Sequence, residues 1–273
     1  MFSTRGDFAL GNIDGIQVVS PVQNENQASR FLKSIGQNLL HGINGRNTGV
    51  APFASISSSG IGLVPKLEKR TGTDFPETFC HISRKDCPAL IGTGARSKRL
   101  AGIKNIDVYA MGFYIDTGAA KGELGRDFDC LPPGSLEHNQ ALAERLMLSN
   151  NIEKNIRIVV TSSMVNQARF SKGLRESLEP RVKQTGDLAA LDEFEGLFNG
   201  AQFYKGLEMS FSNTKEGSLA LRIGNKEVGQ VDSPGFTRAF FDLYLGTDPV
   251  SQDGKASIAK GLAAVISKAG SEK

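Results

Sequence analysis

The sequence has no tryptophan, few cysteines and histidines, and no long run of apolar residues. No stretch approaches the ~20 apolar residues that a membrane-spanning helix needs, so we do not expect an integral membrane protein. Positive and negative charges almost balance, and the net charge of +3 is spread along the chain. Nucleic-acid-binding domains concentrate basic residues on one face, and because no such pattern is present we expect no nucleic acid as a partner.

The scarcity of cysteine and histidine also limits the chemistry that the chain can support. Cys80, Cys87 and Cys130 match no zinc-binding spacing, and only His81 among the histidines lies beside them in the sequence. We therefore expect reduced thiols, no metal and no disulfide framework.

The motifs of several common enzyme classes are missing. The sequence contains no Gly-x-Ser-x-Gly elbow and no phosphate-binding loop, and Gly92-x-Gly94 lacks the third glycine and the helix of a dinucleotide site. Asp192, Glu193 and Glu195 fit a solvated helix face better than a pair of catalytic carboxylates. We expect no cofactor, and an enzyme built on this chain would lack a conventional general base.

The distribution of residue types divides the chain into two regions. We expect residues 1–70 to form an N-terminal extension, with an amphipathic helix at about 26–43 and a Gly/Ser-rich linker behind it. Residues 71–273 are expected to form the compact domain, with a core rich in phenylalanine. Its predicted strands are 77–82, 89–99, 105–116, 155–162, 206–212, 217–223 and 226–231, and its predicted helices are 134–147, 165–182, 187–198, 235–246 and 251–268.

This order of elements predicts an α+β fold, in which a layer of helices covers one large antiparallel sheet. Several helix ends carry signals of their own. Ser233 and Gly246 are expected to cap the two ends of one helix, and Asp187 the start of another. Pro180 is expected to end, or nearly end, the helix that begins near residue 165.

The most informative pattern lies in the first long hairpin. An antiparallel pairing through a turn at Gly102-Ile103 places opposed residues at numbers summing to about 205. The pairs expected on one face are Gly92 with Phe113, Gly94 with Met111, and Arg96 with Tyr109. Glycines facing large apolar groups indicate a pocket that ends in a guanidinium and a phenol, suited to an apolar anion. Two other interpretations stay open: the glycines mark a close backbone approach, and Arg96 is a surface residue.

These residues and several later segments resemble the chalcone isomerase superfamily. The resemblance spans about residues 72–268 and rests on the order and spacing of several motifs. They are Gly92-x-Gly94-x-Arg96, the strand at 105–114, Arg169 to Leu174, the strands around Val228 to Pro234, and Phe240 to Gly246. It implies an open-faced β-sandwich, with the large sheet covered by helices.

The resemblance also implies roles for single residues. Plant chalcone isomerases use an arginine that Arg96 matches, and Tyr109 stands where their second strand carries threonine. Phe170, Ser177 and Leu243 stand where the family has a tyrosine, an asparagine and a further hydroxyl residue. Only the arginine is retained, and the candidate catalytic residues of an isomerase would be Arg96, Tyr109 and Ser177.

Arg96 paired with Tyr109 is instead similar to the plastid fatty-acid-binding branch of the superfamily. There the two residues hold a carboxylate, for which guanidinium is a bidentate partner. The resemblance implies a free fatty acid as ligand and no catalytic residues. The expected ligand-binding residues are Arg96, Tyr109, Met111, Phe113, Phe170 and Leu243. The expected location is the chloroplast stroma, or otherwise the cytoplasm. A chalcone-flavanone isomerase and an auxiliary, non-catalytic protein of flavonoid biosynthesis remain alternatives. The sequence carries no signature of oligomeric state.

Overall fold

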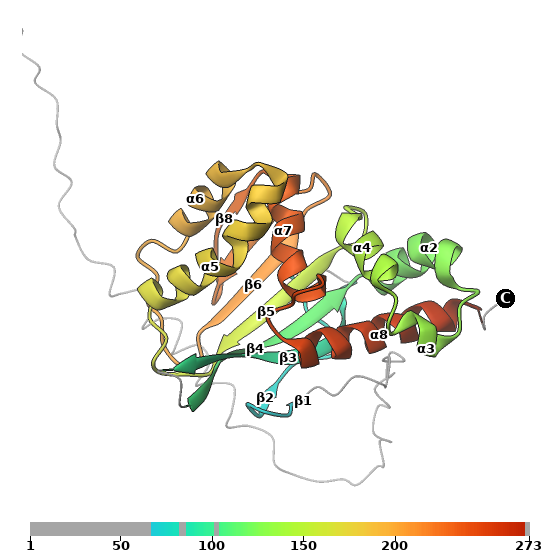
Figure 1. Ribbon diagram of the computed structural model, residues 1–273, viewed down its shortest axis with the longest axis horizontal. Helices are drawn as coiled ribbons and strands as arrows, with labels where there is room; N and C mark the ends of the chain where they lie inside the picture. Colours follow the sequence, from blue (N-terminus) through green and yellow to red (C-terminus); the bar gives the residue numbers. More distant parts are fainter. Residues whose placement is uncertain (1–66, 82–85, 101–103, 271–273) are drawn as a thin grey trace, which may run out of the picture. The chain divides into compact units, whose positions relative to one another are not determined.

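The computed structural model describes residues 67–81, 86–100 and 104–270 (Figure 1). The helix expected at 26–43 and the turn expected at Gly102-Ile103 lie outside the described residues. No helix within the described ranges combines the length and the hydropathy that crossing a bilayer requires.

Six strands form one antiparallel sheet in which every strand pairs with its neighbours in sequence. They are β3 (Ala89–Leu100), β4 (Lys104–Ile115), β5 (Lys154–Val160), β6 (Glu208–Asn213), β7 (Leu219–Ile223) and β8 (Lys226–Val231). Two short strands, β1 (Leu67–Glu68) and β2 (Thr73–Asp74), pair separately. The strand predicted at 77–82 is reduced to a single bridge between Thr78 and Ala89.

Seven helices are described, and together they build one core against one face of the sheet. They are α2 (Thr117–Phe128), α3 (Pro133–Leu136), α4 (Gln140–Leu148), α5 (Gln167–Thr185), α6 (Leu188–Gly196), α7 (Pro234–Leu245) and α8 (Gln252–Gly270). In Figure 1, α5, α6 and α7 lie on the left of the view, α2, α3 and α4 on the right, and α8 runs beside β3. The predicted α+β class, with helices layered on a large antiparallel sheet, is confirmed.

The helix boundaries agree with the predictions in part. Ser233 caps α7 by accepting a hydrogen bond from the Phe236 amide at 3.0 Å, and Asp187 caps α6. The helix predicted at 134–147 is two helices, because the chain breaks and the Asn139 side chain starts α4 afresh. Helix α2 was not predicted.

Helix α5 passes through Pro180 and ends five residues later, so the prediction that Pro180 ends it was wrong. Proline costs the helix one hydrogen bond, to the carbonyl four residues earlier. Leu178 and Val182 are fully buried on either side of it and hold the helix against the core. The helix ends at Gly186, whose φ of +79° is a conformation that glycine adopts without strain.

Helix α8 lies so close to β3 that only glycine fits between them. An added Cβ would be 2.6 Å from the Ile258 backbone at Gly92, and 2.5 Å from the Gly254 Cα at Gly94. At Gly261 it would lie 1.8 Å from a carbonyl oxygen of β3. The glycines of β3 therefore allow helix α8 to pack directly against the strand and leave no open space above them. The expectation of a pocket there was wrong, and the alternative of a close backbone approach is confirmed.

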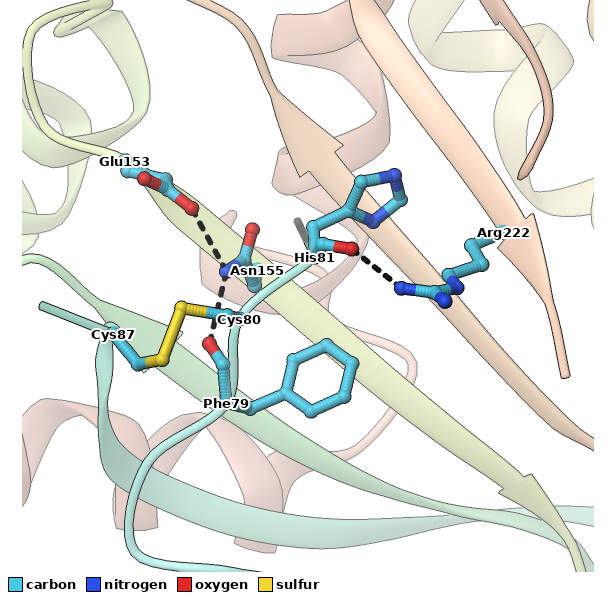
Figure 2. Close-up of a disulfide and its surroundings, with 7 residues drawn as sticks. All are labelled: Phe79, Cys80, His81, Cys87, Glu153, Asn155 and Arg222. Carbon is cyan, nitrogen blue, oxygen red and sulfur yellow. Dashed lines mark hydrogen bonds between the residues drawn. A yellow bond between two sulfur atoms is a disulfide. The ribbon is translucent and has the colours of Figure 1, made fainter. Parts of the chain in front are cut away.

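The other face of the sheet carries a strap, which we define as the described residues among 75–88. Phe75 fills the space above Gly112, and the Phe79 ring lies 5.5 Å from that of Tyr114. Figure 2 shows the strap held to β5 and β7, where Asn155 Nδ2 donates to the Phe79 carbonyl and Arg222 Nη1 to the His81 carbonyl.

A disulfide joins Cys80 to Cys87 within the strap, so the prediction of reduced thiols was wrong for this pair (Figure 2). Their Cα atoms lie 4.9 Å apart because the strap folds back on itself over the sheet. Cys130 is a free, exposed thiol.

Candidate functional site

Arg96 and Tyr109 lie opposite each other on β3 and β4, as the hairpin register predicts. Gly94 also pairs with Met111 and Gly92 with Phe113, as predicted. The register shifts on either side of these three pairs, between Leu90 and Gly92 and between Arg96 and Ser97. Tyr109 is 3% exposed, whereas Arg96 is only partly buried. The Arg96 guanidinium carbon lies 6.0 Å from the centre of the Tyr109 ring, within cation–π range.

A cavity of about 40 Å³ opens beside this pair. Its walls combine three cations, two phenols and an apolar remainder, with no carboxylate and no histidine among the described residues that form it. They are Arg96, Lys98, Val108, Tyr109, Ile158, Arg169, Phe170, Gly173, Leu174, Phe211, Phe240 and Tyr244. The cavity wall thus combines positive charge with hydrophobic side chains, which favours an anion with an apolar body.

Tyr244 is a wall residue that the sequence reasoning missed. Its hydroxyl lies 3.4 Å from that of Tyr109, and its side chain is 1% exposed. Burial first, and then the nearby Tyr109, raises the pKa of Tyr244 well above its ordinary value, so the phenol stays neutral and able to donate. The helical spacing of the sequence could have identified Tyr244, because it lies four residues after Phe240 and the two side chains share a helix face. Both residues line the cavity.

Arg96 is held in place by helix α5. Its Nη2 donates to Ser177 Oγ at 2.7 Å and to the Gly173 carbonyl at 3.3 Å. Ser177 Oγ in turn donates to the same carbonyl at 2.8 Å, so the hydroxyl is free to accept from Arg96. Burial lowers the pKa of Arg96, but the hydrogen bond with Tyr109 and the negative charge that Tyr109, Tyr244 and Glu176 carry when ionised more than offset this and raise it, so the guanidinium remains charged.

The structure separates the other predicted site residues into two groups. Phe170 lies in the cavity wall, and its ring stacks 4.9 Å from that of Phe203. Met111, Phe113 and Leu243 are buried in the core and are not among the wall residues. The methyl of Met111 packs beneath Gly254 of α8, and Phe113 meets the edge of a phenylalanine of α7.

The arrangement suits holding an anion better than moving a proton. A fixed guanidinium and phenol hydroxyls can bind and orient a carboxylate, whereas the described walls contain no carboxylate or imidazole that would act as a general base. No three His, Cys, Asp or Glu side chains gather as a metal site within the described ranges.

A second cavity, of about 230 Å³, lies between α3, α4 and α8. Its one lysine, Lys255, already donates to Gln140 Oε1 and to the Gly246 carbonyl, both at 2.8 Å. This ammonium therefore links structural elements together, and Arg96 is the better candidate for an anion.

Proteins similar to this chain were found by sequence. A family model described as chalcone isomerase-like matches residues 136–258. Fatty-acid-binding protein 2 of Arabidopsis thaliana is 32% identical over 208 residues, which cover 74% of this chain and 52% of that protein. Fatty-acid-binding protein 1 of the same plant is 29% identical over 211 residues, covering 76% and 72%. The chain thus spans about half the length of the first relative.

A solved structure agrees with these relatives. The crystal structure of an Arabidopsis thaliana fatty-acid-binding protein matches with a TM-score of 0.67 at 27% identity, over 73% of this chain and 98% of that one. Chalcone isomerase-like protein 1 of Humulus lupulus is 24% identical over 185 residues, covering 66% and 82%. These findings confirm the resemblance to the chalcone isomerase superfamily.

Proposed function

We propose that this protein, whose domain is chalcone isomerase-like, binds a free fatty acid without converting it, with the carboxylate held by Arg96 and Tyr109. The observation that carries the proposal is the described cavity wall, which combines a fixed guanidinium, two further cations and two phenol hydroxyls with apolar side chains and contains no carboxylate or histidine. Two relatives are named fatty-acid-binding proteins, which supports this ligand class.

Both parts of a fatty acid find partners here. The carboxylate is a bidentate match for a guanidinium, and the Tyr109 hydroxyl supplies one further hydrogen bond. The acyl chain contacts Phe170, Leu174 and Phe211, and each methylene removed from water stabilises the complex by ~0.8 kcal/mol. Ten such groups contribute about 8 kcal/mol, so the apolar wall supplies most of the affinity.

We test this by native mass spectrometry of protein expressed in bacteria. The wild type is expected to retain fatty acid, and Arg96→Ala is expected to lose it. The matched control is Lys255→Ala in the second cavity, which is expected to retain the ligand. A wild-type protein that carries no lipid and takes up none on incubation with fatty acid contradicts the proposal.

Tyr109→Phe keeps the ring and removes only the hydroxyl. We expect it to weaken fatty-acid binding by about 1 kcal/mol, the usual contribution of one hydrogen bond, or roughly a fivefold rise in Kd. Fluorescence titration measures this change, and an unchanged Kd would show that the carboxylate does not reach this phenol.

The proposed setting is plastid fatty-acid metabolism in the chloroplast stroma, on the basis of the resemblance to the plastid branch. Incubation of the radiolabelled precursor with isolated chloroplasts tests it. Import and processing to a smaller, protease-protected product are expected, and failure to import contradicts the location.

The similarity to the Humulus lupulus protein keeps a second candidate, an isomerase or an auxiliary protein of flavonoid biosynthesis. Ser177 is hydrogen-bonded to Arg96 and is not among the wall residues, so the wall offers cations and phenols but no amide or small hydroxyl side chain to align a polyphenol. Cyclisation of naringenin chalcone above the spontaneous rate, without retained lipid, would favour this candidate.

A further inference from the structure

The Arg96 cavity is much smaller than a fatty acid. Its volume of about 40 Å³ is far below the ~300–1,000 Å³ that is typical of ligand pockets. Close-packed interiors do not compress to admit a chain, so one wall has to move before the ligand enters.

The walls differ in how firmly they are fixed. Tyr109 lies on an inner strand, paired with β3 on one side and β5 on the other. Helix α7 is largely buried, with eight of its twelve residues inside the core, whereas α5 buries five of nineteen. Moving α5 exposes the least apolar surface, so it is the wall that opens at the lowest cost.

Pro180 divides α5 into an arm and an anchor. The arm, residues 167–179, supplies the cavity wall through Phe170, Gly173 and Leu174. The anchor is fixed to α7, because Arg181 Nε donates to Asp242 Oδ2 at 2.7 Å. Since proline has no N–H, one of the helical hydrogen bonds that join the two parts is missing at this point, although Arg181 Nη1 of the anchor donates to the Ser177 carbonyl of the arm at 2.7 Å. Bending is therefore easier there than in an unbroken stretch of helix.

Polar contacts close the arm onto β3 at its exposed side. Lys98 Nζ lies 2.7 Å from Glu176 Oε2, and both side chains are about half exposed. The same ammonium sits over the arm at Gly173, where an added Cβ would be 3.3 Å from it. The Arg96 hydrogen bonds to Ser177 Oγ and to the Gly173 carbonyl also join the strand to the arm.

We propose that the arm of α5 is the gate of the fatty-acid site, hinged at Pro180 and latched to β3 by the Lys98–Glu176 ion pair. This inference rests on the proposed function. The incoming carboxylate carries a full charge and accepts two hydrogen bonds, so it displaces Ser177 from Arg96 and favours the open arm. Binding of the head group and entry of the acyl chain are thereby coupled.

The test compares two substitutions, each of which removes one exposed ion pair. Glu176→Gln removes the latch without altering a wall residue. Its matched control, Asp127→Asn, removes the ion pair between Asp127 of α2 and Arg145 of α4, whose side chains are also about half exposed and which lies outside α5. Stopped-flow fluorescence follows binding and release of cis-parinaric acid, and amide hydrogen exchange follows the arm in the ligand-free protein.

For Glu176→Gln we expect association to accelerate about two- to fivefold, the range that one exposed ion pair supplies, with dissociation nearly unchanged and Kd lowered by the same factor, because the latch holds only the ligand-free arm. Exchange at 167–179 is expected to accelerate, while Asp127→Asn leaves both rates and the exchange near wild type. Unchanged rates in both variants overturn the gate. Faster association with slower dissociation also overturns it, because that result reflects only attraction by the freed Lys98.

The same measurements separate the gate from the proposed function. If the wild type binds no probe, the proposed function fails, and with it the role of the arm in fatty-acid entry. Accelerated exchange in Glu176→Gln alone would then support only the mechanical latch. If the wild type binds the probe and exchange at 167–179 does not respond to Glu176→Gln, the gate fails while the proposed function stands.

Discussion

Lys154 at the start of β5 is a buried charge whose titration we expect to control stability above neutral pH. The side chain is 1% exposed, and its ammonium donates to the carbonyls of Ser149 and Ile152, the second at 3.2 Å. The Phe241 ring lies 5.5 Å away. Burial lowers the pKa of Lys154 from 10.5 to about 8, and the Glu123 carboxylate offsets only part of that effect.

The sign of the effect follows from the two pKa values. Below pH 8 the lysine is protonated in both states, and the folded state bears the cost of a buried charge. As the pH rises above 8, the folded protein releases this proton while the unfolded chain keeps it until about pH 10.5. The free energy of unfolding therefore rises with pH, by up to about 1.4 kcal/mol per unit. Between pH 7 and pH 9.5 the gain is about 2 kcal/mol.

Urea denaturation at a series of pH values measures this gain, with Lys154→Met as the control. The scan stops at pH 9.5, because burial raises the pKa of Tyr114 and Tyr244, and their retained protons lower stability above pH 10. We expect the wild type to gain stability between pH 7 and 9.5 and the variant to show a flat profile. Equal profiles for the two proteins would refute the assignment to Lys154.

Other predictions concern packing and the disulfide. Gly261→Ala forces a methyl group against a backbone carbonyl of β3 and is expected to lower the free energy of unfolding by about 3 kcal/mol. Gly122→Ala adds a methyl group to an open stretch of α2 and is expected to raise the free energy of unfolding by about 0.5 to 1 kcal/mol. Urea denaturation checks both, and equal effects would contradict the close approach of α8. Replacing Cys80 and Cys87 by serine removes a short loop closure and is expected to cost about 2.5 kcal/mol. Cys130→Ser is the control, and a double variant as stable as the wild type would count against a structural role for the disulfide.

The sequence predicted the centre of the candidate site because that part depends on local rules. Side chains alternate along a strand and a hairpin has one register, so Arg96 opposite Tyr109 followed without knowledge of the rest of the fold. Phe170 came from the resemblance, and the structure places it in the same wall.

The residues that were missed or misplaced depend on distant parts of the chain. Tyr244 was passed over because spacing from the helix-ending glycine pointed to its neighbour Leu243, and only the docking of α7 decides which of the two faces the cavity. The space assumed above Gly92 and Gly94 is taken by a helix more than 150 residues later in the chain.

Two further differences have local explanations. Helix α2 holds three glycines in twelve residues and has no strong hydrophobic stripe, so its sequence does not predict a helix. It forms because the Asp116 side chain caps its first turn and its buried residues pack against the core. The disulfide between Cys80 and Cys87 depends on how an irregular strap folds back over the sheet, which cysteine spacing alone does not specify.

The burial of β4 on both faces has a consequence for its tolerance of mutation. From Tyr109 to Ile115 every residue is buried, because one set of side chains meets the helices and the alternate set meets the strap. In a strand with one face in solvent, every second residue tolerates substitution. Saturation mutagenesis of residues 109–115 is therefore expected to find no such tolerant positions. Strand β8, which is exposed or partly exposed along most of its length, should accept many substitutions. In this fold, the strand that carries Tyr109 is among the least free to vary.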